Sequence, residues 1–311
     1  MGRFDERAVR LPSPLELLRW RTSRALWRRP PAAGWAPPTE AADTKLVASG
    51  RAQLTWLGHA SFSFSLGGLR FLVDPVLGPR VGPVPRLAAP GIAAHDLPPV
   101  DVVLVTHNHR DHMDLDTLAR VPGRPRFVVP LGNAAVLAPI ARGRIDELDW
   151  WDELDLSVGE RRGPVTVRLV PASHWSMRVP WDRNEALWGG FVVKGPEGTL
   201  YHSGDTGHFE GFREIGERAG PIDWALLPIG AYEPRPFLRA QHMGPDEAVE
   251  AAVALRTRTM VAMHWGTFRL TAEHPAEPPE LARVAHRDAV SAGRTASDLW
   301  VLPIGATRLL G

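Results

Sequence analysis

Apolar and polar residues follow one another along this chain in two patterns, which predict two kinds of strand. From residue 62 to 66, phenylalanine and leucine alternate with serine, the period of two that is typical of a half-buried strand. Gly67 and Gly68 predict a turn, and residues 69–73 then form the returning strand of a hairpin. Residues 102–105 are instead continuously apolar, which indicates a strand that is covered on both faces.

Both patterns recur further along, and they alternate with helical segments. Alternation returns at 165–169, and short apolar runs predict more strands at 191–193, 200–201, 224–227 and 260–263. Residues 246–256 are predicted to be a helix, because Gly244 and Pro245 precede them and acidic residues occupy the first turn. This mixture of hairpins, buried strands and helices predicts an α/β (α+β) fold in which helices cover the outer faces of sheets.

Residues 1–50 differ from the rest of the chain. The first thirty residues carry eight arginines and three acidic residues, and Ser13 to Glu16 form a capping-box pattern with Pro14 at the first helical position. We therefore expect a basic amphipathic helix that ends before Pro30, followed by a proline-rich linker. Such a helix fits either an anionic membrane surface or the surface of the main domain. A single catalytic domain is expected from 51 to 311.

The composition excludes several classes of protein. Of 311 residues, 44% are hydrophobic and 23% charged, and 36 basic side chains face 35 acidic ones, which argues against disorder and against a dedicated nucleic-acid binder. The absence of cysteine rules out disulfides, cysteine-ligated metal sites and thiol nucleophiles. No apolar run is long enough to cross a bilayer, and the N-terminus has no secretory signal. We expect a cytoplasmic protein that is not secreted, with peripheral membrane contact through the basic helix as an alternative to helix packing.

The strongest chemical signal is the run Thr-His-Asn-His-Arg-Asp-His at 106–112. His107, His109 and His112 would repel one another if charged and are costly to bury if neutral, whereas a metal ion uses neutral imidazole and carboxylate as its ligands. His107 and His109 are two residues apart and point the same way in extended backbone. Asp111 and His112 follow a turn and can reach a second position nearby.

Three further candidates each lie just beyond the end of a predicted strand, where α/β sheets place ligands. They are His174, Asp205 and His264. With the first cluster they make five histidines and two aspartates, enough for two metal ions and an open position for water. Because no thiolate is available, a zinc pair with nitrogen and oxygen ligands is expected, with iron or manganese as alternatives.

At these residues the chain resembles the metallo-β-lactamase superfamily and, more narrowly, the family of N-acyl-phosphatidylethanolamine-hydrolysing phospholipases D. The resemblance runs over about residues 54–304. Besides the His-x-His-x-Asp-His motif, it rests on Thr-Trp-Leu-Gly-His-Ala at 55–60, Gly-Asp-Thr-Gly at 204–207, Gly-Ala-Tyr-Glu-Pro-Arg at 230–235 and His-Trp-Gly-Thr-Phe at 264–268. The metal motif alone indicates the superfamily, and the last two blocks point to the narrower family.

The resemblance implies an αββα four-layer sandwich with a dinuclear zinc site and hints at a homodimer. By similarity, one zinc ion is held by His107, His109 and His174, the other by Asp111, His112 and His264, and Asp205 bridges the two ions. Asp111 and His242 are the implied catalytic residues, and His242, Tyr232 and Gln241 the implied substrate-binding residues. Asp74 either orients a ligand or simply forms a turn.

The function implied is that of a zinc-dependent phosphodiesterase of phospholipase D type. A metal-bridging hydroxide would hydrolyse N-acyl-phosphatidylethanolamine-like lipids to phosphatidic acid and N-acylethanolamine. The residues themselves indicate only metal-assisted hydrolysis. Two alternatives therefore stay open: hydrolysis of another ester, lactone or phosphodiester, such as a sugar-phosphate lactone, and a metal-stabilised scaffold without activity. The tryptophans near the ligand segments either line an acyl-chain channel or fill the core.

Overall fold

The chain folds around two seven-stranded β-sheets. A computed structural model describes residues 2–10, 34–156 and 164–311. The basic helix that we expect after Ser13 lies outside the described residues. In the described part, the strand order is β16-β1-β2-β3-β6-β7-β8 in the first sheet and β15-β14-β13-β12-β11-β10-β9 in the second.

The first sheet begins as an antiparallel meander and continues as a parallel sheet. Its strands are β1 (Gln53–Gly58), β2 (Ser61–Leu66), β3 (Leu69–Val73), β6 (Val102–Leu104), β7 (Arg126–Pro130), β8 (Ile145–Leu148) and β16 (Thr307–Leu309). The predicted hairpin is confirmed: β2 and β3 pair antiparallel, and both turn glycines have the positive φ that a tight turn needs. From β3 to β8 the neighbouring strands are parallel.

The second sheet mixes the two directions in the same way. Its strands are β9 (Glu153–Asp155), β10 (Thr166–Val170), β11 (Gly190–Gly195), β12 (Gly198–His202), β13 (Trp224–Pro228), β14 (Thr259–Met263) and β15 (Asp298–Trp300). Strands β9 to β12 are antiparallel, and β12 to β15 are parallel. The short strands β4 (Arg80–Val81) and β5 (Val84–Pro85) form a separate hairpin.

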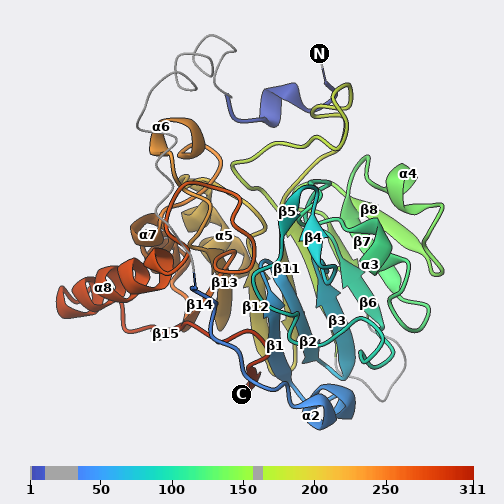
Figure 1. Ribbon diagram of the computed structural model, residues 1–311, viewed down its shortest axis with the longest axis horizontal. Helices are drawn as coiled ribbons and strands as arrows, with labels where there is room; N and C mark the ends of the chain where they lie inside the picture. The colour runs from blue at the N-terminus through green and yellow to red at the C-terminus, as the bar shows by residue number, and fades with distance from the viewer. Residues whose placement is uncertain (1, 11–33, 157–163) are drawn as a thin grey trace.

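Helices cover the outer face of each sheet, as Figure 1 shows. Over the first sheet lie α2 (Thr44–Ser49), α3 (Leu115–Leu118) and α4 (Ala134–Leu137), and over the second α5 (Gly211–Ala219), α7 (Pro245–Leu255) and α8 (Glu277–Ser291). Two short elements, η1 (Asp5–Arg7) and α6 (Arg235–Leu238), lie outside these layers. The αββα sandwich is therefore confirmed. The helix predicted at 246–256 is confirmed as α7, in which Glu247 accepts a hydrogen bond from the backbone N–H of Gly244.

One feature of β2 differs from the prediction. The alternation at 62–66 indicates a half-buried strand, yet every residue of β2 is buried. The reason is that β2 lies inside the sheet and its second face is covered by α2. The buried hydroxyl of Ser61 is satisfied, because it donates to the carbonyl oxygen of Asp74 and accepts from the N–H of Val76.

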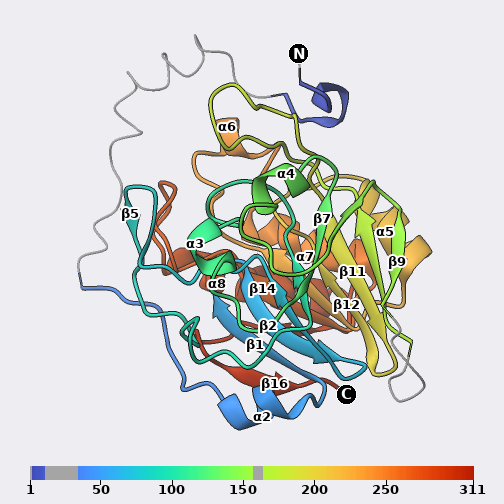
Figure 2. The same cartoon turned by 90° about the vertical axis from the view of Figure 1, so that its right-hand side faces the viewer.

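The described parts of the N-terminal region pack on the sandwich. Phe4 is buried in the core, and its N–H donates to the carbonyl oxygen of Asn184. Residues 2–10 accordingly lie beside the loop that precedes β11 in both Figure 1 and Figure 2. The domain boundary at residue 50 stays a prediction. Among the described residues, no helix is both long and apolar enough to cross a membrane.

Candidate metal centre

Three histidines from two different sheets bring their ring nitrogens together. His107 and His109 follow β6 of the first sheet, and His174 follows β10 of the second. His109 Nδ1 lies 2.9 Å from His107 Nε2 and 3.2 Å from His174 Nε2. These three side chains therefore form one compact group of potential metal ligands.

The neighbours of these rings determine which nitrogen carries the proton. The Thr106 hydroxyl donates to Asp74 Oδ2, so its lone pair accepts from His107 Nδ1. His174 Nδ1 donates in the same way to the carbonyl oxygen of Gln241. His107 and His174 therefore each direct the bare lone pair of Nε2 towards His109 Nδ1. An N–H at His109 Nδ1 can point at only one of these two lone pairs, whereas a cation between the three nitrogens would satisfy all of them.

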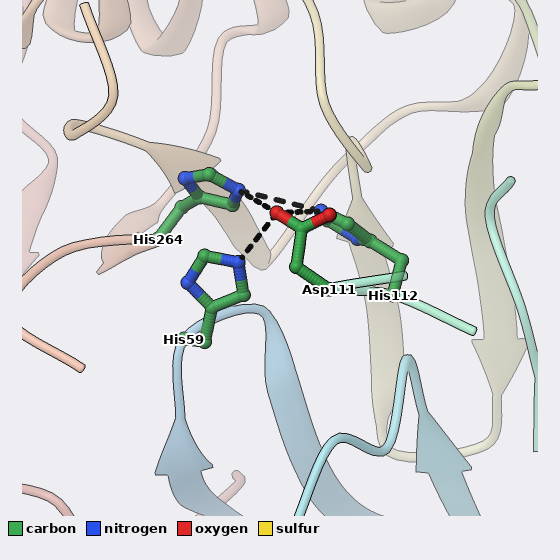
Figure 3. Close-up of side chains that lie close together, drawn as sticks. All are labelled: His59, Asp111, His112 and His264. Carbon is green, nitrogen blue, oxygen red and sulfur yellow. Dashed lines mark hydrogen bonds and ion pairs between the residues drawn. The ribbon is translucent and has the colours of Figure 1, made fainter. Parts of the chain in front are cut away.

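A second group of side chains contacts Asp205, and Figure 3 shows its members together with His59. Asp111 and His112 come from the loop after β6, and His264 follows β14. His264 Nε2 lies 3.3 Å from His112 Nε2 and 3.7 Å from Asp111 Oδ2. His112 Nδ1 donates to Asp74 Oδ2 at 2.7 Å, which leaves its Nε2 directed into the group. Asp74 thus orients a ligand, one of the two roles considered for it.

Asp205 lies between the two groups. Its Oδ2 is 3.1 Å from His112 Nε2, 3.9 Å from His174 Nε2 and 4.0 Å from His107 Nε2, and its Oδ1 is 3.0 Å from His264 Nε2. The loop after β12 holds this carboxylate in place, because the Met243 N–H donates to the carbonyl oxygen of Thr206. One buried carboxylate therefore reaches nitrogens of both groups.

Without a metal ion, the histidines of the two groups have pKa values shifted in opposite directions. Burial, reinforced by the neighbouring imidazoles, holds the pKa of His107 well below its ordinary value, and burial does the same for His174. Burial also opposes the charge on His264, but Asp205 and Asp111 outweigh it and raise its pKa to about 9. The pKa of His112 is raised for the same reason. Protons on these two rings balance the carboxylates, a role that divalent cations can take over.

The residues present fit a metal centre. The candidate ligand set contains imidazole nitrogens and carboxylate oxygens only, which suits zinc and other divalent transition metals. Five histidines and two aspartates that the sequence analysis singled out converge here, from loops that follow β6, β10, β12 and β14. Partners behind the rings fix their orientation, as functional metal sites require.

Sequence reasoning missed His59 as a member of the site. His59 is buried in the turn between β1 and β2, and its Nε2 lies 3.1 Å from Asp111 Oδ2 (Figure 3). It belongs to the same ligand group as Asp111, His112 and His264. His59 also has a φ of 55°, a left-handed conformation that residues other than glycine adopt at some cost and that often marks a functional site. The Gly-His pair directly after a strand was the available signal.

The three predicted substrate-binding residues lie at different places. His242 Nδ1 is 3.9 Å from Asp205 Oδ2 and has no hydrogen-bond partner among the described residues, so His242 lies at the candidate metal centre. Gln241 accepts a hydrogen bond from Trp175 Nε1, and the Tyr232 hydroxyl donates to Glu277. The polar groups of Gln241 and Tyr232 are therefore engaged within the protein, and their contact with a substrate stays a prediction.

Tryptophans near the ligand segments have several roles. Trp188 and Trp265 are buried in the core, and Trp265 stacks on Trp56. Trp175 packs edge-on against His109, with ring centroids 4.7 Å apart. Trp181 is the exception, because 81% of its surface is exposed. Most of these side chains therefore support the ligand loops or fill the core.

Comparison with known families agrees with the fold and the cluster of ligands. The family described as the beta-lactamase superfamily domain matches residues 69–265, which include all the ligand candidates except His59. Among solved structures, a metallo hydrolase of Ignicoccus hospitalis aligns with a TM-score of 0.63 and 25% identity, over 83% of this chain and 97% of that one. A diiron β-hydroxylase of Streptomyces venezuelae shares the fold, with a TM-score of 0.59 and 21% identity, over 83% of this chain and 53% of that one.

Proteins related in sequence indicate a narrower family. An N-acyl-phosphatidylethanolamine-hydrolysing phospholipase D of Caenorhabditis elegans is 37% identical over 72% of this chain and 67% of its own length. An uncharacterised protein of Mycobacterium tuberculosis is 38% identical over 83% of this chain and 71% of its own length. A metal-dependent hydrolase of Pyrobaculum arsenaticum is 34% identical over 72% of this chain and 88% of its own length. The chain therefore belongs to the metallo-β-lactamase superfamily and, within it, to the family of N-acyl-phosphatidylethanolamine-hydrolysing phospholipases D. It is a metal-dependent hydrolase by family.

Proposed function

We propose that this protein is a dinuclear metal phosphodiesterase of phospholipase D type. Its substrate would be an N-acyl-phosphatidylethanolamine-like phospholipid, and its products phosphatidic acid and an N-acylethanolamine. The observation that carries the proposal is the position of Asp205, whose carboxylate contacts nitrogens of two separate ligand groups. The similarity to the Caenorhabditis elegans phospholipase D supplies the substrate class.

Zinc is the metal we propose, with iron or manganese as alternatives. His107, His109 and His174 would hold one ion, and Asp111, His112 and His264 the other, with Asp205 shared between them. Bound divalent ions supply Lewis acidity and lower the pKa of a water molecule from about 15.7 towards neutrality. The chain needs no serine or cysteine nucleophile for such a hydrolysis.

His242 is the side chain of the site that we propose to contact the phosphate. Burial lowers its pKa to about 4, so the ring is neutral at pH 7 and has one N–H to donate. It is 13% exposed, whereas His107, His174 and His264 are almost fully covered, so a substrate can reach it. A hydrogen bond from this ring to a phosphoryl oxygen would orient the phosphodiester and stabilise the charge that develops on it.

The decisive experiment is an assay of the purified protein on N-acyl-phosphatidylethanolamine in mixed micelles. Metal-dependent release of phosphatidic acid and N-acylethanolamine is expected, and removal of metal with a chelator should abolish it. A parallel panel should contain a cyclic phosphodiester, a simple aryl ester and a sugar-phosphate lactone. Turnover of the lactone or ester without turnover of the lipid would show that the substrate class is wrong while metal-dependent hydrolysis holds.

A further inference from the structure

His59 joins two ligand candidates of the second group that come from different sheets. Its side chain reaches Asp111, with 3.1 Å between Nε2 and Oδ2. Its carbonyl oxygen accepts a hydrogen bond from the backbone N–H of His264 at 3.0 Å, and the centroids of the two imidazole rings lie 3.9 Å apart. His59 therefore contacts both residues at once, and it does so from the first sheet, whereas His264 follows a strand of the second.

The turn that carries His59 is anchored on several sides. The His59 N–H donates to Thr267 Oγ1 at 2.6 Å, and Trp56 Nε1 donates to the same carbonyl oxygen that accepts from His264. Phe268 packs edge-on against the His59 ring, with ring centroids 5.3 Å apart. These contacts hold the backbone of His59 in its left-handed conformation and leave the ring few other orientations.

The geometry separates two roles that His59 could have, that of a ligand and that of a residue behind a ligand. His112 Nε2 and His264 Nε2 both approach Asp205, at 3.1 and 3.0 Å. Among the described residues, His59 shares no group of potential metal ligands with Asp205, and its own group holds Asp111, His112 and His264. Its Nε2 lies 3.1 Å from Asp111 Oδ2, a distance at which the ring N–H can donate a hydrogen bond to the carboxylate.

We propose that His59 is a positioning residue of the second metal position: its Nε2–H holds the Asp111 carboxylate, while its backbone carbonyl holds the loop of His264. This role rests on the proposed metal centre but not on the lipid substrate. A carboxylate that ligates a metal needs such a partner to fix which lone pair faces the ion, and loss of partners of this kind typically costs about 10–100-fold in metal affinity.

Two substitutions separate the side-chain role from the backbone role. His59→Asn keeps a residue that tolerates the left-handed conformation, but its amide is too short to reach Asp111. His59→Gln places an amide N–H near the position of the imidazole Nε2–H and can replace the donor. His286→Gln is the matched control, because His286 lies in α8 and makes a hydrogen bond to the carbonyl oxygen of Ser297, and it belongs to no group of potential metal ligands among the described residues.

The experiment is a titration of the metal-free full chain with Co²⁺, followed by visible absorption and by total metal content. We expect the wild type and His286→Gln to take up two ions. His59→Asn should bind one ion as the wild type does and the other about 10–100-fold more weakly, with an altered Co²⁺ spectrum for that ion. His59→Gln should recover most of the lost affinity. Urea unfolding of the metal-free proteins checks that the variants are folded.

Three results would overturn the proposal. Uptake of both ions by His59→Asn with wild-type affinity would remove any role of the side chain. Equal weakening in His59→Gln and His59→Asn, with one nitrogen fewer around the ion by X-ray absorption, would make His59 a ligand instead. Failure of the wild type to take up two ions would contradict the proposed dinuclear centre itself. This outcome is distinct from the other two, because it is read from the wild type and does not depend on the variants.

Discussion

At the scale of single residues, the site depends on buried charged side chains that stabilise one another. Asp205 is almost completely buried, and it would be costly to bury as an isolated charge. The imidazoles of His112, His264 and His242 outweigh the effect of burial and hold the pKa of Asp205 well below its ordinary range. The carboxylate is therefore ionised and available to two groups of ligands.

Asp205→Asn should remove that shared negative charge while keeping the shape of the side chain. We expect at least a 100-fold loss of hydrolytic activity, about the upper range for disturbing a metal site, and a metal content below two ions per chain. Metal analysis and initial rates on the lipid substrate measure the two effects. Wild-type activity in this variant would show that Asp205 does not hold the metals.

His242→Gln tests the proposed role at the phosphate. Because His242 is proposed to contact the substrate rather than a metal, turnover should fall by about 10²–10³-fold, the usual cost of losing one such hydrogen-bond donor, while both ions remain bound. Steady-state kinetics together with metal analysis make the measurement. Loss of one ion in this variant would instead place His242 among the ligands.

At the scale of elements, the site is held by the loops that follow strands and by short helices that fix those loops. Glu247, at the start of α7, pairs with Arg235, and Arg235 in turn donates to the carbonyl oxygen of His242. The segment after His242 is held as well, because the Met243 N–H donates to the carbonyl oxygen of Thr206 beside Asp205. Both contacts keep His242 beside the candidate metal centre.

Arg235→Met should loosen His242 without touching a metal ligand. We expect a fall in turnover of about tenfold, smaller than for loss of the imidazole itself, with unchanged metal content. Arg218→Met on α5 is a control. Arg218 also forms an ion pair with a glutamate, in this case on the same helix, but it lies away from the cluster. Equal losses in the two variants would argue against a specific hold on His242.

At the scale of the whole molecule, two large hydrophobic cores lead us to expect that the chain folds without metal. One core lies between the sheets and extends under α5, α7 and α8, and the other lies between the first sheet and α2, α3 and α4. The ligand loops meet at one edge of these layers. Metal binding should therefore add stability to a chain that is already folded.

Removal of metal should lower the unfolding temperature but leave a cooperative transition. Ions that bind only the folded state at about 1,000 times their Kd contribute about 4 kcal/mol, and a loss of that size lowers the midpoint by at least about 5 °C in a chain of this length. Calorimetry with and without a chelator measures the shift. An unchanged midpoint would mean that the cluster binds no metal in the folded protein.

Membrane contact through the expected N-terminal basic helix is a further prediction at this scale. Replacing Arg19, Arg21 and Arg24 by alanine should weaken sedimentation with anionic vesicles at least tenfold, since each basic residue near such a surface contributes about 1 kcal/mol. A matched triple change on and after α8, at Arg283, Arg287 and Arg294, should have little effect. Equal binding by the first variant and the wild type would favour the alternative, in which the expected N-terminal helix packs on the domain.

The sequence by itself determined the metal chemistry and most of the strands. His107, His109, Asp111 and His112 occur within six residues, so local geometry alone brings them together, and the apolar runs of β6, β13 and β14 are buried wherever they pack. The carboxyl ends of strands supplied His174, Asp205 and His264, because such ends gather at an edge of the sheets.

Only the tertiary structure decided which of these residues share a group and what lies behind them. The burial of both faces of β2, the long-range contact of His59 with Asp111, and the engagement of Tyr232 and Gln241 all depend on elements far apart in the sequence. A periodic pattern of apolar residues indicates which face of a segment is buried. It does not indicate which distant side chain forms a hydrogen bond with a given donor, and such long-range hydrogen bonds are what fix the orientation of the histidines in the site.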